Sequence, residues 1–357
     1  MKILILSCNT GGGHNSCGKY IKEEFELNNI ECDFKNYFEI VHLSKKDFSN
    51  NIYVKTLGKN GGVFKYIYKM GEVYDKTKLV SPVYLINKIQ SLRLYDYIKQ
   101  NHYDLIICSH LYPALALTAI NKRHKVDFIF VDTDYAYQPF TDEIKADYYV
   151  IPKGLQEQFI ARGIDKDKLL PFGIPISSRY VNNAKENRRK SKKNILVLLG
   201  SMGFGNVEDC IDDLLKIKKA NIIVVCGNNK KLYNKLKNIN NPNLKVIGYS
   251  SHINDLIKSS DIVISKPGGL SSTEIAAFRK AIIHVYPIPG VETSNVEFFN
   301  KNNLSMMANN KEEIIKYINI LLKNDNIYDD MIKNQEKYIS SNSAKELVDF
   351  VKNKYEN

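Results

Sequence analysis

The stretch KILILSCNTGGGHN (residues 2–15) opens the chain, and NILVLLGSMGFGN (residues 194–206) repeats its form. In each, an apolar run typical of a buried strand leads into a glycine-rich turn and then into a helical pattern. This unit is typical of the start of a doubly wound domain. A chain of 357 residues is also long enough for two domains. The repeat therefore predicts an α/β protein with two doubly wound, Rossmann-like domains facing a central cleft.

Both halves alternate short apolar runs with helical patterns, which predicts parallel sheets covered by helices. The strands expected in the first half are 2–7, 33–37, 104–108, 127–131 and 148–151. Those expected in the second half are 194–199, 221–226, 244–247, 262–265 and 281–285. The clearest helices are 15–27, 155–162, 207–218 and 271–278, and the residues after Lys311 keep helical spacing to the end.

Domain boundaries follow from the polar, charged stretch NNAKENRRKSKK (182–193), which is typical of a linker. We expect an N-terminal domain at 1–181 that contains an insertion at 52–100. A C-terminal domain is expected at 194–325. Helices at 326–357 follow it, and their return to the first domain is left open.

Composition narrows the function classes. The net charge of +12 suits nucleic acid, an anionic membrane surface or an anionic substrate. No recognition helix or RNP pattern occurs in the sequence, so a nucleic-acid-binding protein is the remote alternative. No apolar run reaches the ~20 residues that span a bilayer, and the start does not fit a signal peptide, so we expect a cytoplasmic protein. Six scattered cysteines without a CxxC pair predict buried free thiols.

The stretch 52–100 departs from the α/β pattern because it interleaves aromatic residues with lysines. Such a basic, aromatic, amphipathic segment can lie on an anionic membrane, with its tyrosines at headgroup depth. The alternative is a solvated insertion whose tyrosines pack against the domain. Both interpretations stay open on these residues alone. The residues expected at the membrane or the acceptor are Phe64, Lys65, Tyr66, Tyr68 and Lys69.

Three motifs resemble known functional signatures, but in each case the match is weak. GHNSCGKY (13–20) fits a P-loop except at Tyr20, where the pattern needs the Ser or Thr that binds Mg²⁺. GGGHNS lacks the third glycine of GxGxxG, and no acid ends the next expected strand, so a Rossmann dehydrogenase is disfavoured. DTD (132–134) follows an expected strand and is a weak candidate for holding Mn²⁺ against a nucleotide diphosphate.

The most informative stretch is ISKPGGLSSTEIAAFRKAIIHVYPIPGVETSNVEFF (264–299). A strand ends, a Pro-Gly-Gly turn follows, and Ser271, Ser272 and Thr273 open a helix. Free N–H groups at a helix N-terminus, together with hydroxyls, form an anion site suited to a diphosphate. Glu274 can then accept hydrogen bonds from a ribose diol. The equally supported alternative is a capping box, in which Ser271 caps the helix and Glu274 reaches back.

This stretch resembles the donor-sugar signature of GT-B glycosyltransferases that act on lipids. It is similar to the peptidoglycan enzyme that adds N-acetylglucosamine to lipid I. It resembles more closely the diacylglycerol glucosyltransferases and monogalactosyldiacylglycerol synthases, a family 28-like group. The matching residues are Lys266 to Gly269, Thr273, Glu274, Pro287 to Gly290, Glu292 and Asn295.

Other motifs extend the resemblance over nearly the whole chain. They are TGGGH (10–14), VDTDY (131–135), FGIPISSRY (172–180) and the segment that leads into the donor stretch. Two features depart from the family pattern: Val291 replaces a glutamine that would touch the sugar, and residues 135–140 lack the usual histidine and tryptophan.

The resemblance implies a hexosyltransferase that moves glucose or galactose from a UDP-sugar to a lipid hydroxyl, with inversion at the anomeric carbon. Diacylglycerol is the expected acceptor and a glycolipid the product. The alternative is a UDP-sugar transferase of the same fold that acts on a polyprenyl-linked or soluble acceptor, with UDP-N-acetylglucosamine as an open donor. The resemblance further implies no metal cofactor, no nucleic acid partner, and peripheral association with the anionic cytoplasmic face of the cell membrane.

The site residues follow from the same resemblance. His14 is the expected catalytic base, because a neutral imidazole accepts protons near neutral pH, with Asp134 and His110 in reserve. The loop 200–205 and the turn 268–273 would stabilise the leaving group, and 247–249 would meet the uracil edge. The residues expected to bind the UDP-sugar are Gly12, Gly13, Gly200, Ser201, Gly203, Ile247, Gly248, Tyr249, Lys266, Gly268, Gly269, Ser271, Ser272, Thr273, Glu274, Pro289, Gly290, Glu292 and Asn295.

Overall fold

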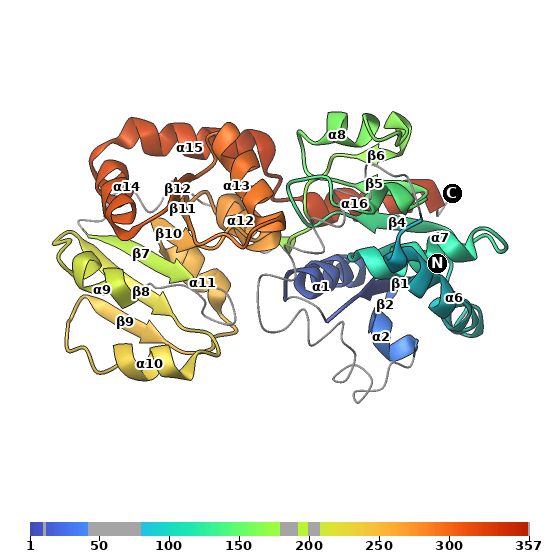
Figure 1. Cartoon of the computed structure of the whole chain (residues 1–357), viewed down its shortest axis with the longest axis horizontal. Coiled ribbons are helices and arrows are strands. Elements are labelled where there is room, and N and C mark those ends of the chain that lie inside the picture. The colour runs from blue at the N-terminus through green and yellow to red at the C-terminus, as the bar shows by residue number, and fades with distance from the viewer. Residues whose placement is uncertain (10–11, 42–79, 179–191, 199–207, 356–357) are drawn as a thin grey trace. The chain divides into compact units, whose positions relative to one another are not determined.

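The computed structural model describes residues 1–9, 12–41, 80–178, 192–198 and 208–355, and Figure 1 labels its helices and strands. The chain divides into two compact units. The first holds Met1–Ser178, Pro289–Val291 and Asn342–Asn357, and the second holds Arg179–Ile288 and Glu292–Ser341. Each unit is built around a six-stranded parallel sheet. The prediction of an α/β chain with two doubly wound sheets is therefore confirmed.

The sheet of the first unit has the strand order β2-β1-β3-β4-β5-β6, and all neighbours run parallel. A parallel sheet is covered by helices on both faces, so its inner strands are apolar without alternation. All four residues of β3, LIIC, are completely buried. The strands are β1 (Lys2–Ser7), β2 (Glu31–Asn36), β3 (Leu105–Cys108), β4 (Phe128–Val131), β5 (Tyr148–Val150) and β6 (Leu169–Leu170).

The helices of the first unit pack in two groups. Right-handed crossovers place the helix from β1 to β2 on one face of the sheet and the helices from β2 to β3 and from β3 to β4 on the other. Accordingly, α1 packs with α16, and α6 packs with α7. The helices are α1 (Gly12–Leu27), α2 (Tyr37–Ile40), α6 (Pro82–Gln100), α7 (Leu111–Ile120), α8 (Gln156–Ile160) and α16 (Ser343–Tyr355).

The sheet of the second unit has the order β12-β11-β10-β7-β8-β9, again with parallel neighbours. Its strands are β7 (Lys193–Leu198), β8 (Ala220–Val225), β9 (Leu244–Ile247), β10 (Ile262–Ser265), β11 (Ala281–Val285) and β12 (Met306–Ala308). The helices are α9 (Glu208–Leu215), α10 (Lys230–Leu236), α11 (Ile253–Ser259), α12 (Gly269–Ala277), α13 (Val291–Lys301), α14 (Lys311–Lys323) and α15 (Asp325–Tyr338). Ile314, Ile318 and Leu321 of α14 complete the core that the strands of this unit form.

The strand order reverses once in each sheet, next to its first strand. The reversal lies between β1 and β3 in the first unit and between β7 and β10 in the second. Open α/β sheets bind ligands outside the carboxyl ends of the two strands at such a point. The loops that follow these four strands are therefore where the functional residues are expected, and they include TGGGH after β1 and KPGG after β10.

Most predicted elements are confirmed. The bounds of β1, β9, β10 and β11 agree with the prediction, and the helical pattern after Lys311 is confirmed by α14, α15 and α16. All six cysteines are buried free thiols, as expected. The prediction missed β6 and β12, which have only two and three residues. In the described part of the chain, no helix is both long and apolar enough to cross a bilayer.

The end of the predicted insertion belongs to the main fold. Its last residues form α6, which is the crossover helix between β2 and β3. Tyr84 on this helix is buried, Tyr95 stacks on His124, and Tyr97 stacks on Tyr103. These tyrosines therefore pack against the unit, as the second interpretation had it. Phe64, Lys65, Tyr66, Tyr68 and Lys69 lie outside the described residues.

Candidate functional site

The carboxyl ends of β1, β3 and β4 bring polar groups around His14, which stands in the first turn of α1. Its Nδ1 atom lies 3.0 Å from the Ser109 carbonyl oxygen and 2.8 Å from the Thr133 hydroxyl. Ser109 also donates its hydroxyl to the carbonyl of His14, at 3.0 Å. Two groups distant in the sequence thus hold one half-buried imidazole ring at the switch point of the first sheet.

The contact with Ser109 assigns the proton of the neutral imidazole. A carbonyl oxygen only accepts hydrogen bonds, so its approach to Nδ1 places the proton on that nitrogen. The lone pair is then on Nε2. A general base needs a lone pair on a group that is held in place, and Nε2 of His14 meets this requirement.

His110, the other histidine of this cluster, is placed differently. It is the N-cap of α7, where its Nδ1 accepts the N–H of Tyr112 at 3.2 Å. The ring is buried and meets that of His14 edge-on, with 4.7 Å between centroids. Burial, and then the charge of His14, lower the pKa of His110 well below its usual value. A buried imidazole that caps a helix is a poor proton acceptor, which favours His14 as the base.

The two acids of the DTD motif follow β4 and differ in exposure. Asp132 is buried, its Oδ1 accepts the N–H of Asp134 at 3.2 Å, and its Oδ2 has no hydrogen-bond partner. Burial, and next the charge of Asp134, raise the pKa of Asp132 well above its usual range. Asp134 is half-buried. Of the two acids, Asp134 is therefore the one that keeps access to solvent and stays the reserve base.

Two glycines near the start of α1 serve different purposes. Gly12 is exposed, and a Cβ built on it meets nothing within 4 Å. Gly18 packs against β2, and a Cβ there would lie 2.6 Å from the Phe34 ring. Gly18 is therefore required by packing, whereas the open space at Gly12 suits the close approach of a ligand. Gly13 is half-buried beside it.

Helix α12 begins two residues earlier than predicted, with Gly268 as the N-cap and no side chain capping it. The N–H groups of Gly269, Leu270 and Ser271 therefore have no acceptor within the helix. A Cβ on Gly268 would meet nothing within 4 Å, so the space before this N-terminus is open. The capping box of Ser271 and Glu274 does not form, because Ser271 is already the third residue of the helix. The anion site expected at this turn therefore stays a prediction that the uncapped helix start and the open space before it leave possible.

Two hydroxyls expected to bind the donor are used inside the second unit instead. Ser272 is buried, and its Oγ lies 3.0 Å from Nε2 of His284. Thr273 is buried and donates to the Gly269 carbonyl at 2.8 Å. The earlier helix start turns both residues toward the core, and Ser271 alone of the three hydroxyls is exposed.

A buried histidine in β11 connects α12 to the segment before β12. His284 in β11 is completely buried, and its Nδ1 lies 3.0 Å from the Ser305 hydroxyl, just before β12. Burial lowers the pKa of His284 to about 3, so the ring is neutral at physiological pH. With one ring nitrogen on Ser272 and the other on Ser305, His284 joins the donor helix to two neighbouring segments.

The residues of PIPGVETSN that were expected to touch the sugar hold backbone groups. Asn295 in α13 is completely buried and donates Nδ2 to the Pro267 carbonyl at 3.0 Å. Glu292 accepts the N–H of Ile288. Gly290 has a φ of +103°, which favours glycine, and Pro289 before it is exposed. Asn295 is therefore a support of the KPGG turn, because its amide already holds that backbone.

The segment expected at the uracil edge lies at the far side of the second sheet. Ile247 ends β9, its carbonyl accepts the Cys226 N–H at 2.8 Å, and Tyr249 is 72% exposed. Strands β7 and β8 separate β9 from β10, a distance of roughly 14 Å at ~4.8 Å per strand. A ligand that touches both Tyr249 and half-buried Lys266 must span that width. Gly200, Ser201 and Gly203 lie outside the described residues, and Gly248 is half-buried.

Three residues of these clusters were not predicted: Ser109, Thr133 and His284. Ser109 follows β3, and the switch-point rule applied to that strand end was a usable signal. Thr133 stands between the two acids of DTD. His284 gave no signal, because its partners lie 12 and 21 positions away and belong to no motif.

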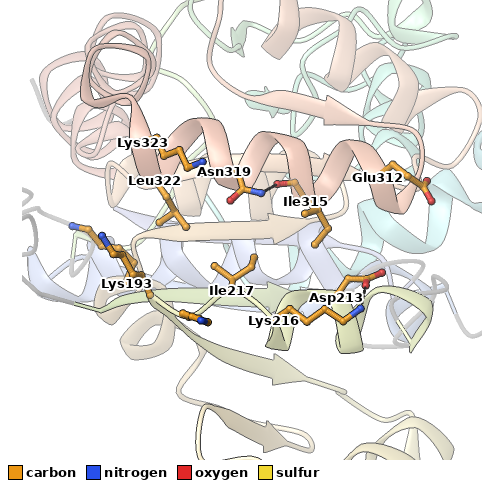
Figure 2. Close-up of a pocket in the computed structure, with 11 residues that line it drawn as sticks. Lys193, Asp213, Lys216, Ile217, Glu312, Ile315, Asn319, Leu322 and Lys323 are labelled. Carbon is orange, nitrogen blue, oxygen red and sulfur yellow. Dashed lines mark hydrogen bonds and ion pairs between the residues drawn. The ribbon is translucent and has the colours of Figure 1, made fainter.

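A pocket of about 700 Å³ in the second unit is lined by residues of α9 and α14, by the segment 216–219 and by Lys193 at the start of β7. Figure 2 draws these side chains. Lys193 begins β7 and Lys219 precedes β8, so the pocket lies at the amino ends of the strands. Lys266 and α12 follow the carboxyl end of β10. Because the strands are parallel, these are opposite edges of the sheet, and the pocket is separate from the expected donor residues.

Two family models match the chain, one in each half. Residues 14–176 match the model described as monogalactosyldiacylglycerol (MGDG) synthase. Residues 194–350 match the glycosyltransferase family 28 C-terminal domain. The first match contains the His14 cluster, and the second contains α12 with its supports.

Similarity to known proteins extends over nearly the whole chain. The processive diacylglycerol beta-glucosyltransferase of Bacillus subtilis is 26% identical over 364 residues, which cover 98% of this chain and 94% of that protein. Its counterpart from Staphylococcus aureus (strain JH9) is 28% identical over 371 residues, covering 98% and 93%. The crystal structure of Acinetobacter baumannii MurG, a GT-B glycosyltransferase, shares the fold with a TM-score of 0.66 at 15% identity, covering 99% and 100%. The chain therefore matches the MGDG synthase model in its first half and the family 28 C-terminal model in its second half, has the GT-B fold, and is a UDP-sugar-dependent glycosyltransferase.

Proposed function

We propose that this enzyme transfers a hexose from UDP-glucose or UDP-galactose to the free hydroxyl of diacylglycerol, with inversion at the anomeric carbon. The observation that carries the proposal is the Ser109 carbonyl on Nδ1 of His14, which leaves Nε2 free to act as a base. We infer diacylglycerol as the acceptor from the names of the two relatives, both processive diacylglycerol beta-glucosyltransferases. Their names make UDP-glucose the first donor to test.

In this mechanism His14 removes the proton of the acceptor hydroxyl. The proton moves to Nε2 as the acceptor oxygen forms its bond to the anomeric carbon. The bond between that carbon and the diphosphate breaks, and UDP leaves with the electron pair. The Ser109 carbonyl and the Thr133 hydroxyl stabilise the Nδ1–H of the imidazolium that results. A base placed in this way contributes about 10²–10⁴-fold to the rate.

The leaving diphosphate is bound by the N-terminus of α12. Its open N–H groups and the positive end of its dipole favour anions, and Lys266 precedes them in the turn. Glu274 accepts hydrogen bonds from the ribose hydroxyls. Hydrogen-bond donors that are in place before the reaction stabilise the negative charge that develops on the leaving UDP. This stabilisation does not require a metal ion. We expect turnover to persist in EDTA. If EDTA abolished turnover and Mn²⁺ restored it, the acids of the DTD motif would be metal ligands.

We also propose that the enzyme works as a peripheral protein at the cytoplasmic face of the membrane, where a bilayer lipid meets a water-soluble nucleotide sugar. The net charge of +12 supports attraction to anionic lipids, a role that needs no nucleic acid partner.

The test combines donors and acceptors. The purified protein is incubated with UDP-glucose, UDP-galactose or UDP-N-acetylglucosamine, and with diacylglycerol vesicles, polyprenyl phosphate or a soluble alcohol. Mass spectrometry is expected to detect hexosyl-diacylglycerol in vesicles supplied with a UDP-hexose. A product formed only from UDP-N-acetylglucosamine, or only on the polyprenyl acceptor, would establish the alternative function.

A further inference from the structure

The pocket of about 700 Å³ in the second unit takes no part in the proposed reaction. It lies at the amino ends of β7 and β8, at the edge of the sheet opposite to the KPGG turn. Its volume is within the range of about 300–1,000 Å³ that is typical of small-molecule sites. We call it the amino-edge pocket, and the chemistry of its lining indicates which ligand it can hold.

The apolar part of the amino-edge pocket is an incompletely covered part of the core. Ile217, Ile315 and Leu322 line the pocket, pack against the core of the second unit, and are each half-buried. Ile217 follows α9, whereas Ile315 and Leu322 lie seven positions apart on one face of α14. Apolar side chains that remain partly in water favour a ligand with an apolar surface that can cover them.

Lysines border this apolar surface. The pocket is lined by five lysines and two acids: Lys193, Lys216, Lys218, Lys219, Lys323, Asp213 and Glu312. Lys216 is paired with Asp213 at 2.7 Å, and Lys193 lies 3.5 Å from the buried Asp261. Lys218, Lys219 and Lys323 are exposed and form no ion pair with any residue that the structure describes. The pocket therefore has an excess of positive charge.

The positive charge is concentrated at one end of the pocket. Lys193 lies beside Lys219, because its N–H donates to the Lys219 carbonyl at 2.9 Å. Figure 2 shows Lys193 and Lys323 toward the same end, and Asp213 and Glu312 toward the other. Glu312 and Lys323 are eleven positions apart on α14, which is about 16 Å of helix. Cations from three segments favour an anion that carries several charges, as a di- or triphosphate does.

Between the two ends, Asn319 offers a hydrogen-bond acceptor. It lies on the face of α14 that carries Ile315 and Lys323, four positions from each. Its Nδ2 donates to the Ile315 carbonyl at 2.9 Å, as the dashed line in Figure 2 shows. What Asn319 offers to a ligand is therefore Oδ1, which only accepts hydrogen bonds. A ligand that covers the apolar surface needs an N–H group at this point.

We propose that the amino-edge pocket binds a nucleoside di- or triphosphate whose base carries an exocyclic amino group. The base lies on Ile217 and Ile315 and donates its amino group to Oδ1 of Asn319. The phosphates lie at Lys219 and Lys323, the latter about 6 Å along α14 from Asn319. Adenine and cytosine carry such an amino group, whereas uracil has a carbonyl oxygen in its place. The ligand therefore differs from the UDP-sugar in its base as well as in its site.

The acidic end of the pocket limits the ligand further. An acidic peptide or a nucleic acid that ran through the pocket would bring its negative charges against Asp213 and Glu312. Like charges across an interface are unfavourable. A single nucleotide carries its negative charge at one end only, which matches the distribution of charge in the pocket.

Calorimetry on the whole protein tests the proposal, with UDP at saturation so that the donor site is occupied. ATP is titrated into this complex and is expected to bind one saturable site. UTP and tripolyphosphate should bind at least several-fold more weakly, because neither donates an exocyclic amino group to Asn319. Absence of ATP binding in the presence of UDP, or equal affinities for ATP and tripolyphosphate, would overturn the proposal.

A double variant tests the position of the phosphates. Lys219→Ala/Lys323→Ala should weaken ATP binding by at least about tenfold, because two charge-assisted hydrogen bonds are lost. Lys231→Ala/Lys316→Ala is the matched control, since it removes the same charge from exposed sites of the second unit outside the pocket. The control should leave the ATP affinity nearly unchanged. Equal affinities in the two double variants would place the phosphates elsewhere and overturn the proposal.

Asn319→Leu tests the recognition of the base, because leucine is similar in size and has no acceptor. The advantage of ATP over UTP should disappear in this variant, and tripolyphosphate binding should stay unchanged. The melting temperature should stay near that of the wild type, since Asn319 is half-buried. If Asn319→Leu still prefers ATP to UTP, the amino group is not read at Asn319 and the proposed ligand class is wrong.

The proposal goes beyond the proposed function and does not depend on it. Without ATP, Lys219→Ala/Lys323→Ala should form glycolipid at the wild-type rate. If the wild type binds ATP as described and forms no glycolipid, the proposed function is wrong and the nucleotide site stands. If glycolipid forms and ATP does not bind beside UDP, the nucleotide site is wrong and the function stands.

Discussion

Thr133 orients His14 through a hydroxyl 2.8 Å from Nδ1. Thr133→Val keeps the branched shape and removes this contact. A hydrogen bond of this kind contributes about 1 kcal/mol, so we expect kcat to fall about 5- to 10-fold, with KM for the UDP-sugar nearly unchanged. Thr133→Ser keeps the hydroxyl and is the control.

Steady-state kinetics on both Thr133 variants decide the point. Equal kcat values for Thr133→Val and Thr133→Ser would mean that the Ser109 carbonyl alone orients the His14 imidazole ring. A rise in KM without a change in kcat would place Thr133 in substrate binding.

Gly268 separates a binding role from a folding role. A Cβ there meets nothing within 4 Å, so Gly268→Ala should leave the melting temperature nearly unchanged. The added methyl group would occupy the space before the α12 N–H groups, and UDP affinity measured by calorimetry should fall at least several-fold. Gly18→Ala is the converse control, because its Cβ would lie 2.6 Å from Phe34 and should cost stability. Unchanged UDP affinity in Gly268→Ala would exclude close approach of the diphosphate at this turn.

The motif residues were predictable at this scale, and their orientation was not. His14 stands in a recognisable turn, but the Ser109 carbonyl that assigns its proton belongs to a strand end 95 residues away. Asn295 belongs to a recognisable motif too, yet its amide holds the Pro267 carbonyl. A sequence motif indicates which side chains meet, and the hydrogen bonds among them depend on packing that the motif does not encode.

At the scale of elements, His284 ties β11 to α12 and to the residue before β12. Its pKa is about 3 in the folded protein, against about 6.5 in an unfolded chain. Between these values only the unfolded chain binds the proton, so stability falls as the pH falls. The slope contributed by this group is about 1.4 kcal/mol per pH unit. The loss should therefore begin as the pH drops below about 6.5.

His284→Gln isolates this contribution, because the amide can bind both serines and does not titrate. Urea unfolding of wild type and variant is compared at several pH values from 7.5 to 4.5. We expect the stability difference between them to shrink or reverse as the pH falls. Parallel curves for the two proteins would show that His284 does not titrate on unfolding in this range.

The accuracy of the element predictions reflects how much signal each element carries. Strands β1, β9, β10 and β11 are bounded by clear apolar runs, and their limits agree with the prediction. Strands β6 and β12 are too short to show a pattern. Helix α12 starts at the second glycine of KPGG, which is a poor helix former, so the predicted start was two residues late. Helix α6 carries apolar residues on two faces, so its pattern departs from the single apolar stripe that identifies a surface helix in a sequence.

At the scale of the whole molecule, the architecture was the most predictable property. Parallel strands buried on both faces read as apolar runs, and most of these runs precede a turn and a helix. The repeated strand–turn–helix unit therefore indicated two sheets before their strand order was known. The switch points follow from that order, and they explain why the loops after β1, β3 and β10 carry the polar clusters.

We propose that this chain moves hexose from a UDP-sugar to diacylglycerol, with Nε2 of His14 as the base. The most direct measurement is the rate at which purified wild-type protein and His14→Ala form hexosyl-diacylglycerol, quantified by mass, from UDP-glucose and diacylglycerol vesicles. We expect the wild type to form hexosyl-diacylglycerol and to release an equal amount of UDP. We also expect the rate to fall by about 10²–10⁴-fold in His14→Ala, with UDP binding retained. Near-wild-type turnover by His14→Ala, or no hexosyl-diacylglycerol from the wild type, would contradict it.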